Sequence, residues 1–279
     1  MAVITRRARA LVDGPLGVLD TLGDQATFFA RTIGWIPRTL SRYKREVLRL
    51  LTEVAFGSGA LAVIGGTVVI VATLTFFTGS VVGLQSYSAL NQIGTSAFSG
   101  FVTAYFNTRE VAPLVSALAL SATVGAGFTA QLGAQRVSEE IDALEVMAVP
   151  SLPFLVTTRV IAGFVAVIPL YVLGLVASYF ASRLLVTNFY TQSSGTYDHY
   201  FNLFLPPEDV VYSFLKVLAF AFAIILIHCY YGYNAGGGPA GVGVAVGNAV
   251  RNSIVVFTVL DNLLTLAIWG TTTSIRIAG

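Results

Sequence analysis

Residues 160–185 read VIAGFVAVIPLYVLGLVASYFASRLL, a long apolar run whose only charged residue, Arg183, lies close to its end. An α-helix rises about 1.5 Å per residue, so about 20 apolar residues cross the hydrocarbon core of a bilayer. A helix also satisfies its own backbone polar groups, which lipid cannot do. The run therefore predicts a membrane-spanning helix.

Four similar runs lie elsewhere in the chain, at Val54–Thr78, Val111–Leu132, Val210–Tyr231 and Ser253–Thr271. The chain has 55% hydrophobic and only 11% charged residues, whereas soluble domains carry about 25% charged residues. We therefore predict an all-α integral membrane protein. A basic cytoplasmic or interfacial segment, residues 1–50, precedes a membrane domain, residues 51–279, with five transmembrane helices.

Basic residues set the predicted orientation, because Lys and Arg are enriched in short cytoplasmic loops. Nine of the 16 basic residues precede the first apolar run. The loops at 133–152 and 232–252 also hold basic residues, whereas the loop at 186–208 holds none. Five spans then place the N-terminus in the cytoplasm and the C-terminus on the periplasmic side of the cell inner (plasma) membrane.

The stretch 81–108, between the first two runs, is interrupted by polar residues. A sixth span here would break the agreement between the loop charges and a single orientation. We predict an outer-side segment that is partly re-entrant; the alternative is that this stretch lengthens the two neighbouring helices.

Residues 13–49 alternate apolar and basic side chains at roughly helical spacing, with Phe28, Ile33, Trp35 and Leu40 among the apolar ones. Arg and Trp on such a segment suit the headgroup layer of a membrane. The segment therefore predicts one or two interfacial amphipathic helices. A cytoplasmic helix packed on a partner is the other interpretation.

The loop after the second run concentrates negative charge. Four acids lie close together in it: Glu139, Glu140, Asp142 and Glu145. Ser138 can cap a helix start, where the helix dipole favours acids, and Leu144 and Met147 fall near helical spacing. The loop predicts a short amphipathic helix at about 138–148, outside the lipid, which would dock a cytoplasmic partner; a solvated connector is the alternative.

The glycine-rich stretch 232–252 lacks both the Gly-Lys-Ser/Thr ending and the preceding strand of a phosphate-binding loop. We expect a loop that allows tight turns and close helix contact, with no nucleotide site and no enzymatic activity in this chain. A single Cys229 and two histidines give no metal-ligand cluster, so no cofactor is expected. The net charge of +2 gives no reason to expect a nucleic-acid partner.

Charged residues inside membrane spans are costly and indicate functional positions by default. Glu110 and Lys216 fall near span ends, where snorkelling of the side chain toward water would explain them. Asp261, followed by Asn262, lies inside the last span. We interpret Asp261 as a hydrogen-bonding tie between helices, because a proton relay would need a chain of such groups.

Several segments carry a family resemblance: EVAPLVSAL at 110–118, VGAG at 124–127, AQLG at 130–133, RVSEEIDALEVMAV at 136–149, GGPAGVGVAVGNAVR at 237–251, SIV at 253–255 and DNLL at 261–264. Together they resemble the MlaE/YrbE permeases, membrane subunits of ABC systems that move lipids between envelope layers. The similarity is greatest to the YrbE subunits of actinobacterial Mce lipid importers. It covers about residues 50–279.

The resemblance implies an N-terminal interfacial helix, five spans, and a cytoplasmic coupling helix that fits a groove on a separate ATPase subunit. The coupling residues carried over are Arg136, Glu139, Glu140, Asp142, Leu144, Glu145 and Met147. Candidates for helix packing or for the translocation path are Glu110, Gly125, Gly127, Asp261 and Asn262.

The resemblance also implies partners. They are a second YrbE-type permease in a heterodimer, a cytoplasmic ABC ATPase dimer that uses the ATP, and MCE-domain proteins that form a periplasmic tunnel. The substrate would be a lipid, and the residues do not distinguish a sterol, a fatty acid, a mycolic acid or a phospholipid. Import and export are equally compatible with the residues.

The residues give less support to two other functions. An ion-coupled secondary transporter of a hydrophobic substrate usually shows inverted repeats and broken helices, and no internal repeat is visible here. An intramembrane lipid enzyme would need a paired nucleophile and base at membrane depth. His228 beside Cys229 is the candidate pair, but neighbouring residues of a helix point in different directions.

Overall fold

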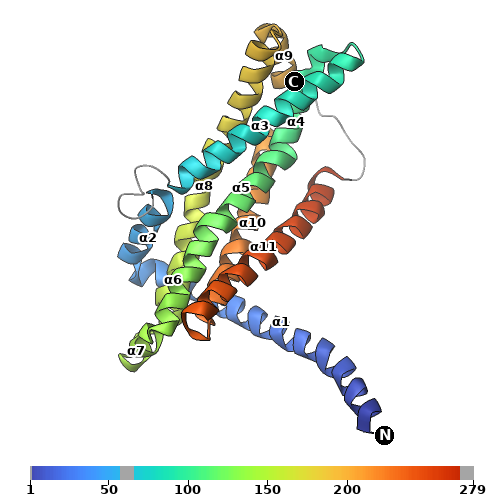
Figure 1. Ribbon diagram of the computed structural model, residues 1–279. Coiled ribbons are helices and arrows are strands. Elements are labelled where there is room, and N and C mark those ends of the chain that lie inside the picture. The colour runs from blue at the N-terminus through green and yellow to red at the C-terminus, as the bar shows by residue number, and fades with distance from the viewer. Residues whose placement is uncertain (1, 57–65, 271–279) are drawn as a thin grey trace.

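The structure is a computed structural model that describes the backbone of residues 2–56 and 66–270 and the side chains of residues 22–54 and 66–270. In this part of the chain the regular elements are helices, as the sequence predicts (Figure 1). They are α1 (Ala2–Arg42), α2 (Lys44–Phe56), α3 (Thr67–Gln92), α4 (Ser99–Phe106), α5 (Ala112–Leu120), α6 (Ala126–Val137), α7 (Glu140–Val146), α8 (Thr158–Leu184), α9 (Ser194–Leu203), α10 (Pro207–Tyr233) and α11 (Gly238–Trp269).

Five helical stretches within the described residues are long and apolar enough to cross a membrane, which confirms the predicted number of spans. They are Thr67–Gln92, Ser96–Val137, Leu152–Phe189, Pro207–Tyr233 and Gly238–Trp269. The second stretch joins α4, α5 and α6 through the π-helical turns Asn107–Val111 and Ser121–Gly125. Such wider turns are rare and often occur at functional sites.

The predicted start of the first span is wrong. Val54 belongs to α2, and the span begins at Thr67 and continues to Gln92. The polar stretch 81–108 therefore lengthens the first two spans. Some of its hydroxyl groups donate back to the preceding turn, as Ser86 does to the carbonyl of Val82 at 2.6 Å, and others bond to another segment, as Ser99 does to Gln192.

The predicted start of the last span is also wrong, because the glycine-rich stretch is mostly helical. Gly237 (φ 80°) and Gly238 (φ 71°) make a tight turn after α10, and α11 starts at once and runs to Trp269. Glycine disfavours helices in water, but a membrane-embedded backbone must bond to itself, so helix formation wins. The predicted end of this span, Thr271, lies outside the described residues.

The bundle is built around α8 and α10. The α3 helix runs along α8, and Gly79 allows this close approach, because a methyl group there would lie 2.5 Å from the carbonyl oxygen of Ser178. The α10 helix is surrounded by α5, α6, α8 and α11. Its residues Phe220, Ile224 and Ile225 form the centre of the apolar core.

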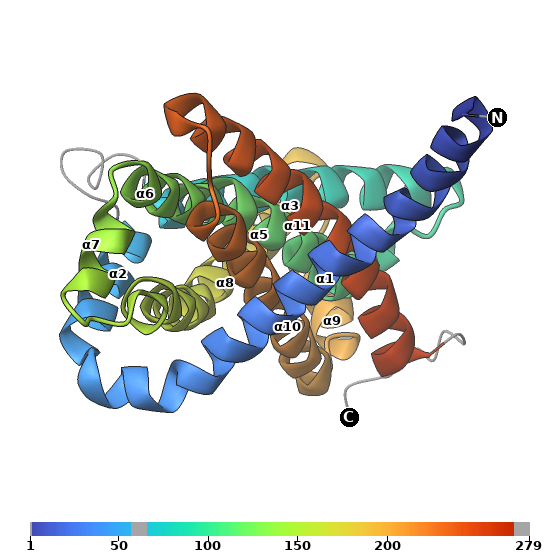
Figure 2. The same ribbon diagram turned by 90° about the horizontal axis from the view of Figure 1, so that it is seen from below.

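The helices α1, α2 and α7 gather at one end of the bundle, and α9 lies at the other end with the turn between α3 and α4 (Figure 1). The predicted segment 13–49, expected as one or two helices, is divided between α1 and α2. Figure 2 shows α1 crossing below the bundle, where Phe28 packs against the rings of Tyr230 and Tyr233. Ile33 and Leu40 on α1 remain exposed, which fits the interfacial interpretation of this helix.

Candidate functional site

The predicted loop helix exists as α7, but it is shorter than 138–148 and begins differently. The hydroxyl group of Ser138 does not cap α7; it donates to a carbonyl in the last turn of α6 (3.0 Å). Glu139 (φ 61°) and Ala148 (φ 58°) adopt left-handed conformations on either side of the helix. Such conformations are uncommon outside glycine and cluster at functional turns. Two sharp turns thus hold α7 at the tip of the bundle.

Two apolar residues of α7 face the bundle. Ile141 is fully buried, and Leu144 is partly buried against the same core. Leu144, which the sequence suggested as a partner contact, therefore contributes first to the internal packing of the loop.

Two other apolar residues and two acids of this loop face outward. Val146 is 89% exposed and Met147 is 64% exposed, which is high for apolar side chains. Glu139 and Glu140 are exposed beside them. The outward face thus combines apolar surface with negative charge, which suits an interface with a complementary protein surface.

The remaining charged residues of the loop form hydrogen bonds with other residues of this chain. Arg136 donates to Asp142 at 2.8 Å, and this ion pair braces α7 on α6. The Ser151 hydroxyl donates to Glu145 at 2.7 Å and lies 2.8 Å from the Tyr233 hydroxyl. These bonds tie α7 to the start of the third span and to the end of α10. A force on α7 would therefore reach three spans directly.

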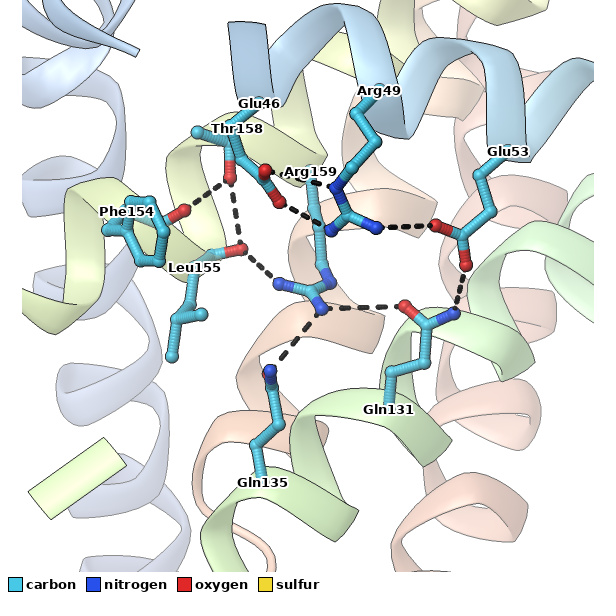
Figure 3. A network of polar contacts seen from close by, with 9 residues as sticks. All are labelled: Glu46, Arg49, Glu53, Gln131, Gln135, Phe154, Leu155, Thr158 and Arg159. Carbon is cyan, nitrogen blue, oxygen red and sulfur yellow. Dashed lines mark hydrogen bonds and ion pairs between the residues drawn. The ribbon is translucent and has the colours of Figure 1, made fainter. Parts of the chain in front are cut away.

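A buried polar network connects α6 to α2 and α8 near the α7 end of the bundle (Figure 3). Arg159 on α8 is 4% exposed and donates to the carbonyl of Leu155 at 2.7 Å. Its Nη2 group lies 3.4 Å from the side-chain oxygens of Gln131 and Gln135 on α6. The amide nitrogen of Gln131 donates to Glu53 on α2 at 2.8 Å.

The same network continues along α2. Arg49 donates to both carboxylate oxygens of Glu46, at 3.0 and 2.5 Å, and to Glu53 at 3.4 Å. The hydrogen bonds from Arg49 hold the pKa of Glu46 below its ordinary value, so this carboxylate is charged at neutral pH. The sequence interpretation missed this network; its only signal was the Gln131 amide inside an otherwise apolar run.

A second buried network surrounds Lys216 on α10. This side chain is fully buried, so the snorkelling explanation is wrong for it. Its Nζ lies 2.6 Å from Asp261 and 3.1 Å from Glu110, and it donates to the Thr265 hydroxyl at 2.8 Å. Asp261 and Glu110, which the sequence singled out separately, therefore meet at one cation that joins α10, α11 and the second span.

Arg109 and Asp209 form a second ion pair next to this cluster. Two guanidinium nitrogens donate to one Asp209 oxygen at 2.9 and 2.7 Å, and the Trp269 indole donates to the other at 2.8 Å. Arg109 also lies over the rings of Tyr105 and Trp269. The sequence interpretation missed this pair, because both residues lie just outside the apolar runs that it used.

Hydroxyl groups hold His228 in the middle of the bundle. The Thr129 hydroxyl donates to the His228 carbonyl at 3.0 Å and lies 2.8 Å from Nδ1, while the Ser121 hydroxyl lies 3.1 Å from Nε2. Ser253 on α11 lies 2.7 Å from Ser121. Gly125 leaves room for the ring, because a methyl group there would lie 2.5 Å from His228 Cδ2. Gly125 is thus a helix-packing position.

The remaining predicted positions have separate surroundings. Gly127 lines a cavity of about 180 Å³ between α6 and α2. Asn262 is exposed on α11, and its amide donates to the Thr258 carbonyl at 3.0 Å. Cys229 is buried, and both ring nitrogens of His228 bond to hydroxyl groups. His228 and Cys229 therefore do not form a paired nucleophile and base.

Five apolar helical spans with an exposed acidic helix between the second and third define a multi-spanning helical membrane protein. Residues 56–267 match the family model described as Permease MlaE. The chain belongs to the MlaE permease family.

Named relatives come from bacteria and from a plant. A "Probable ABC transporter permease protein" of Rickettsia bellii is 34% identical over 70% of this chain and 76% of its own length. The "Intermembrane phospholipid transport system permease protein MlaE" of Haemophilus influenzae is 28% identical over 70% of this chain and 75% of its own. "Protein TRIGALACTOSYLDIACYLGLYCEROL 1, chloroplastic" of Arabidopsis thaliana is 29% identical over 67% of this chain and 54% of its own.

Proposed function

We propose that this chain is the non-catalytic permease subunit of an ABC-type lipid transport complex of the Mce kind. It would form the lipid path across the inner membrane together with a second YrbE-type permease. The observation that carries the proposal is α7, a helix held out by two sharp turns with Val146 and Met147 exposed at its end. A cytoplasmic ATPase dimer would bind this helix, and MCE-domain proteins would continue the path on the periplasmic side.

The internal bonds of the loop support a coupling role for α7. The pairs Arg136–Asp142 and Ser151–Glu145 make α7 continuous with its neighbouring spans. A connector that only links two spans needs no such bracing. Relatives named as ABC transporter permeases favour ATP-driven transport over the ion-coupled alternative. The relative named for phospholipid transport favours a lipid substrate.

The proposed orientation can be tested with two single cysteines at opposite ends of the bundle. Gly195 on α9 and Gly236 after α10 are both exposed, and neither has a close neighbour that a side chain would meet. We expect Gly195→Cys to react with an impermeant maleimide on intact cells and Gly236→Cys to react only after lysis. Native Cys229 is buried and gives the background. Labelling of both or neither before lysis would contradict the proposed topology.

The non-catalytic role leads to a second expectation. The purified chain alone should neither bind nor hydrolyse ATP, whereas addition of its ATPase partner should restore hydrolysis. The measurement is phosphate release from the detergent-purified chain with and without that partner. A Walker-motif variant of the ATPase is the control. Hydrolysis by the clean single chain would contradict the permease assignment.

A further inference from the structure

Arg159 is a buried cation whose charge is balanced only at a distance. It is 4% exposed, and in the described part of the chain no carboxylate forms an ion pair with it. Its Nε group is buried and has no hydrogen-bond acceptor there. A buried charge needs compensation, so the neighbouring groups must provide it indirectly.

The Gln131 amide provides this compensation by joining two charges of opposite sign. Its oxygen faces the Arg159 guanidinium, and its nitrogen donates to Glu53. Only one orientation of the amide satisfies both neighbours, since the oxygen cannot donate and the nitrogen cannot accept. Figure 3 shows Arg159 lying between α2 on one side and Gln131 and Gln135 of α6 on the other.

The main helix pairings lie on either side of this contact. The helices α2 and α3 pack on α8, whereas α6 packs on α10 and α11. We call the line between α6 and the α2–α8 pair the seam. Neither α6 with α2 nor α6 with α8 is among the main helix pairings of the described residues. Polar bonds from Gln131 and Gln135 cross the seam, and polar bonds are directional and lost at small displacements.

A cavity borders the seam and shares two residues, Glu53 and Gln131, with the polar bonds. It has a volume of about 180 Å³ and is lined by α2, α3 and α6, with Glu53 and Gln131 at one side and Val54, Val124 and Phe128 among the apolar walls. Gly127 faces it, and a methyl group there would meet no atom within 4 Å. The polar bonds that cross the seam therefore lie next to unfilled space.

We propose that Gln131 is a positioning residue that closes this seam, and that movement of α7 and α6 opens it on the cytoplasmic side during transport. The opening rests on the proposed function, because the ATPase would supply the movement. The closed state is a property of this chain alone. Gln131 holds the seam shut by linking Arg159 and Glu53, and the free Nε of Arg159 is a donor that a direct carboxylate contact would satisfy once α6 moves away.

The test uses the reactivity of a cysteine inside the seam. Gly127→Cys, in the full chain in membranes of a host that lacks the ATPase, should react slowly with N-ethylmaleimide. Adding Gln131→Leu should raise its labelling rate about tenfold, the change in an opening equilibrium that corresponds to about 1.4 kcal/mol. Gln192→Leu is the matched control, because it removes an amide of the same size that bonds Ser99 at the opposite end of the bundle. It should leave the rate unchanged.

Exchanging the carboxylate at position 53 with the amide at position 131 distinguishes the closing role of Gln131 from a general loss of folding. Gln131→Glu alone places two carboxylates face to face and should open the seam as Gln131→Leu does. Combining it with Glu53→Gln restores the alternation, since the new carboxylate accepts from Arg159 and from the new amide. The double variant should therefore label as slowly as Gly127→Cys alone.

Two results would overturn the proposal. One is a labelling rate that does not respond to Gln131→Leu, or responds equally to Gln192→Leu. The other is a double variant that stays as reactive as Gln131→Glu. Both are measured without any ATPase, so they leave the proposed function untouched. Adding the ATPase and ATP should then accelerate labelling in the otherwise native chain, and a failure at that step alone would count against ATP-driven opening.

Discussion

Replacing Lys216 with methionine is expected to destabilise the folded chain by roughly 3–5 kcal/mol, the usual effect of removing one partner from a buried ion pair. The substitution keeps an unbranched side chain that is one atom shorter but removes the fully buried ammonium group. Asp261 and Glu110 would then face each other without the cation that lies 2.6 and 3.1 Å from them. The measurement is denaturant-induced unfolding of the purified chain in detergent.

The exposed ion pair Arg183–Asp198 gives a matched control for this variant. It has good geometry, with both nitrogen–oxygen distances at 2.7 Å, but both side chains are largely exposed. Arg183→Met should therefore cost only about 0–1 kcal/mol. Neutralising both acids together with Lys216→Met should recover part of the lost stability, because no carboxylate is then left unpaired. Equal losses for Lys216→Met and Arg183→Met would show that the cluster is not a structural tie.

Replacing Met147 with aspartate is expected to release the ATPase while the permease remains folded in the membrane. Burial of one apolar side chain at an interface contributes about 1.5–3 kcal/mol, so the affinity should fall at least about tenfold. Met147 is 64% exposed, so its loss removes little internal packing. A pull-down of the ATPase, with the membrane level of the permease measured in parallel, tests this result.

Two further variants separate docking from folding. Leu48→Asp changes another exposed apolar residue, on α2 at the same end of the bundle, and should retain the ATPase. Ile141→Asp places a charge at a fully buried position and should lower the amount of folded permease itself. If Met147→Asp retains full ATPase binding and transport, α7 is a connector and the docking proposal fails.

The acids of the loop are expected to act mainly on the rate of association. Glu139 and Glu140 are exposed, whereas Asp142 and Glu145 are used in bonds within the chain. Exposed charges steer association, and salt screens their effect. Charge reversal of Glu139 and Glu140 should therefore slow ATPase binding, and most strongly at low ionic strength. Asp142→Lys should in addition disturb the loop, because it removes the bond to Arg136.

The sequence by itself determined the number of spans, the all-helical class and the loop helix. These follow from local properties: the length of an apolar run, its lack of charge, and the clustering of acids beside apolar residues at helical spacing. It did not determine where the spans begin. Thr67 and Gly238 start helices in which Ser, Gln and Gly are frequent, because a backbone inside a bilayer must satisfy its own polar groups even where propensity is poor.

Only the tertiary structure decided which polar residues meet. Lys216 and Glu110 are 106 positions apart in the chain, and Gln131 and Glu53 are 78 apart. Arg109 and Glu110 also lie in a π-helical turn, which shifts the direction of side chains in a way that a regular period does not describe. Periodicity in a sequence indicates which face of a helix is apolar, but the pairing of buried charges depends on how the helices pack, and that is fixed by long-range contacts.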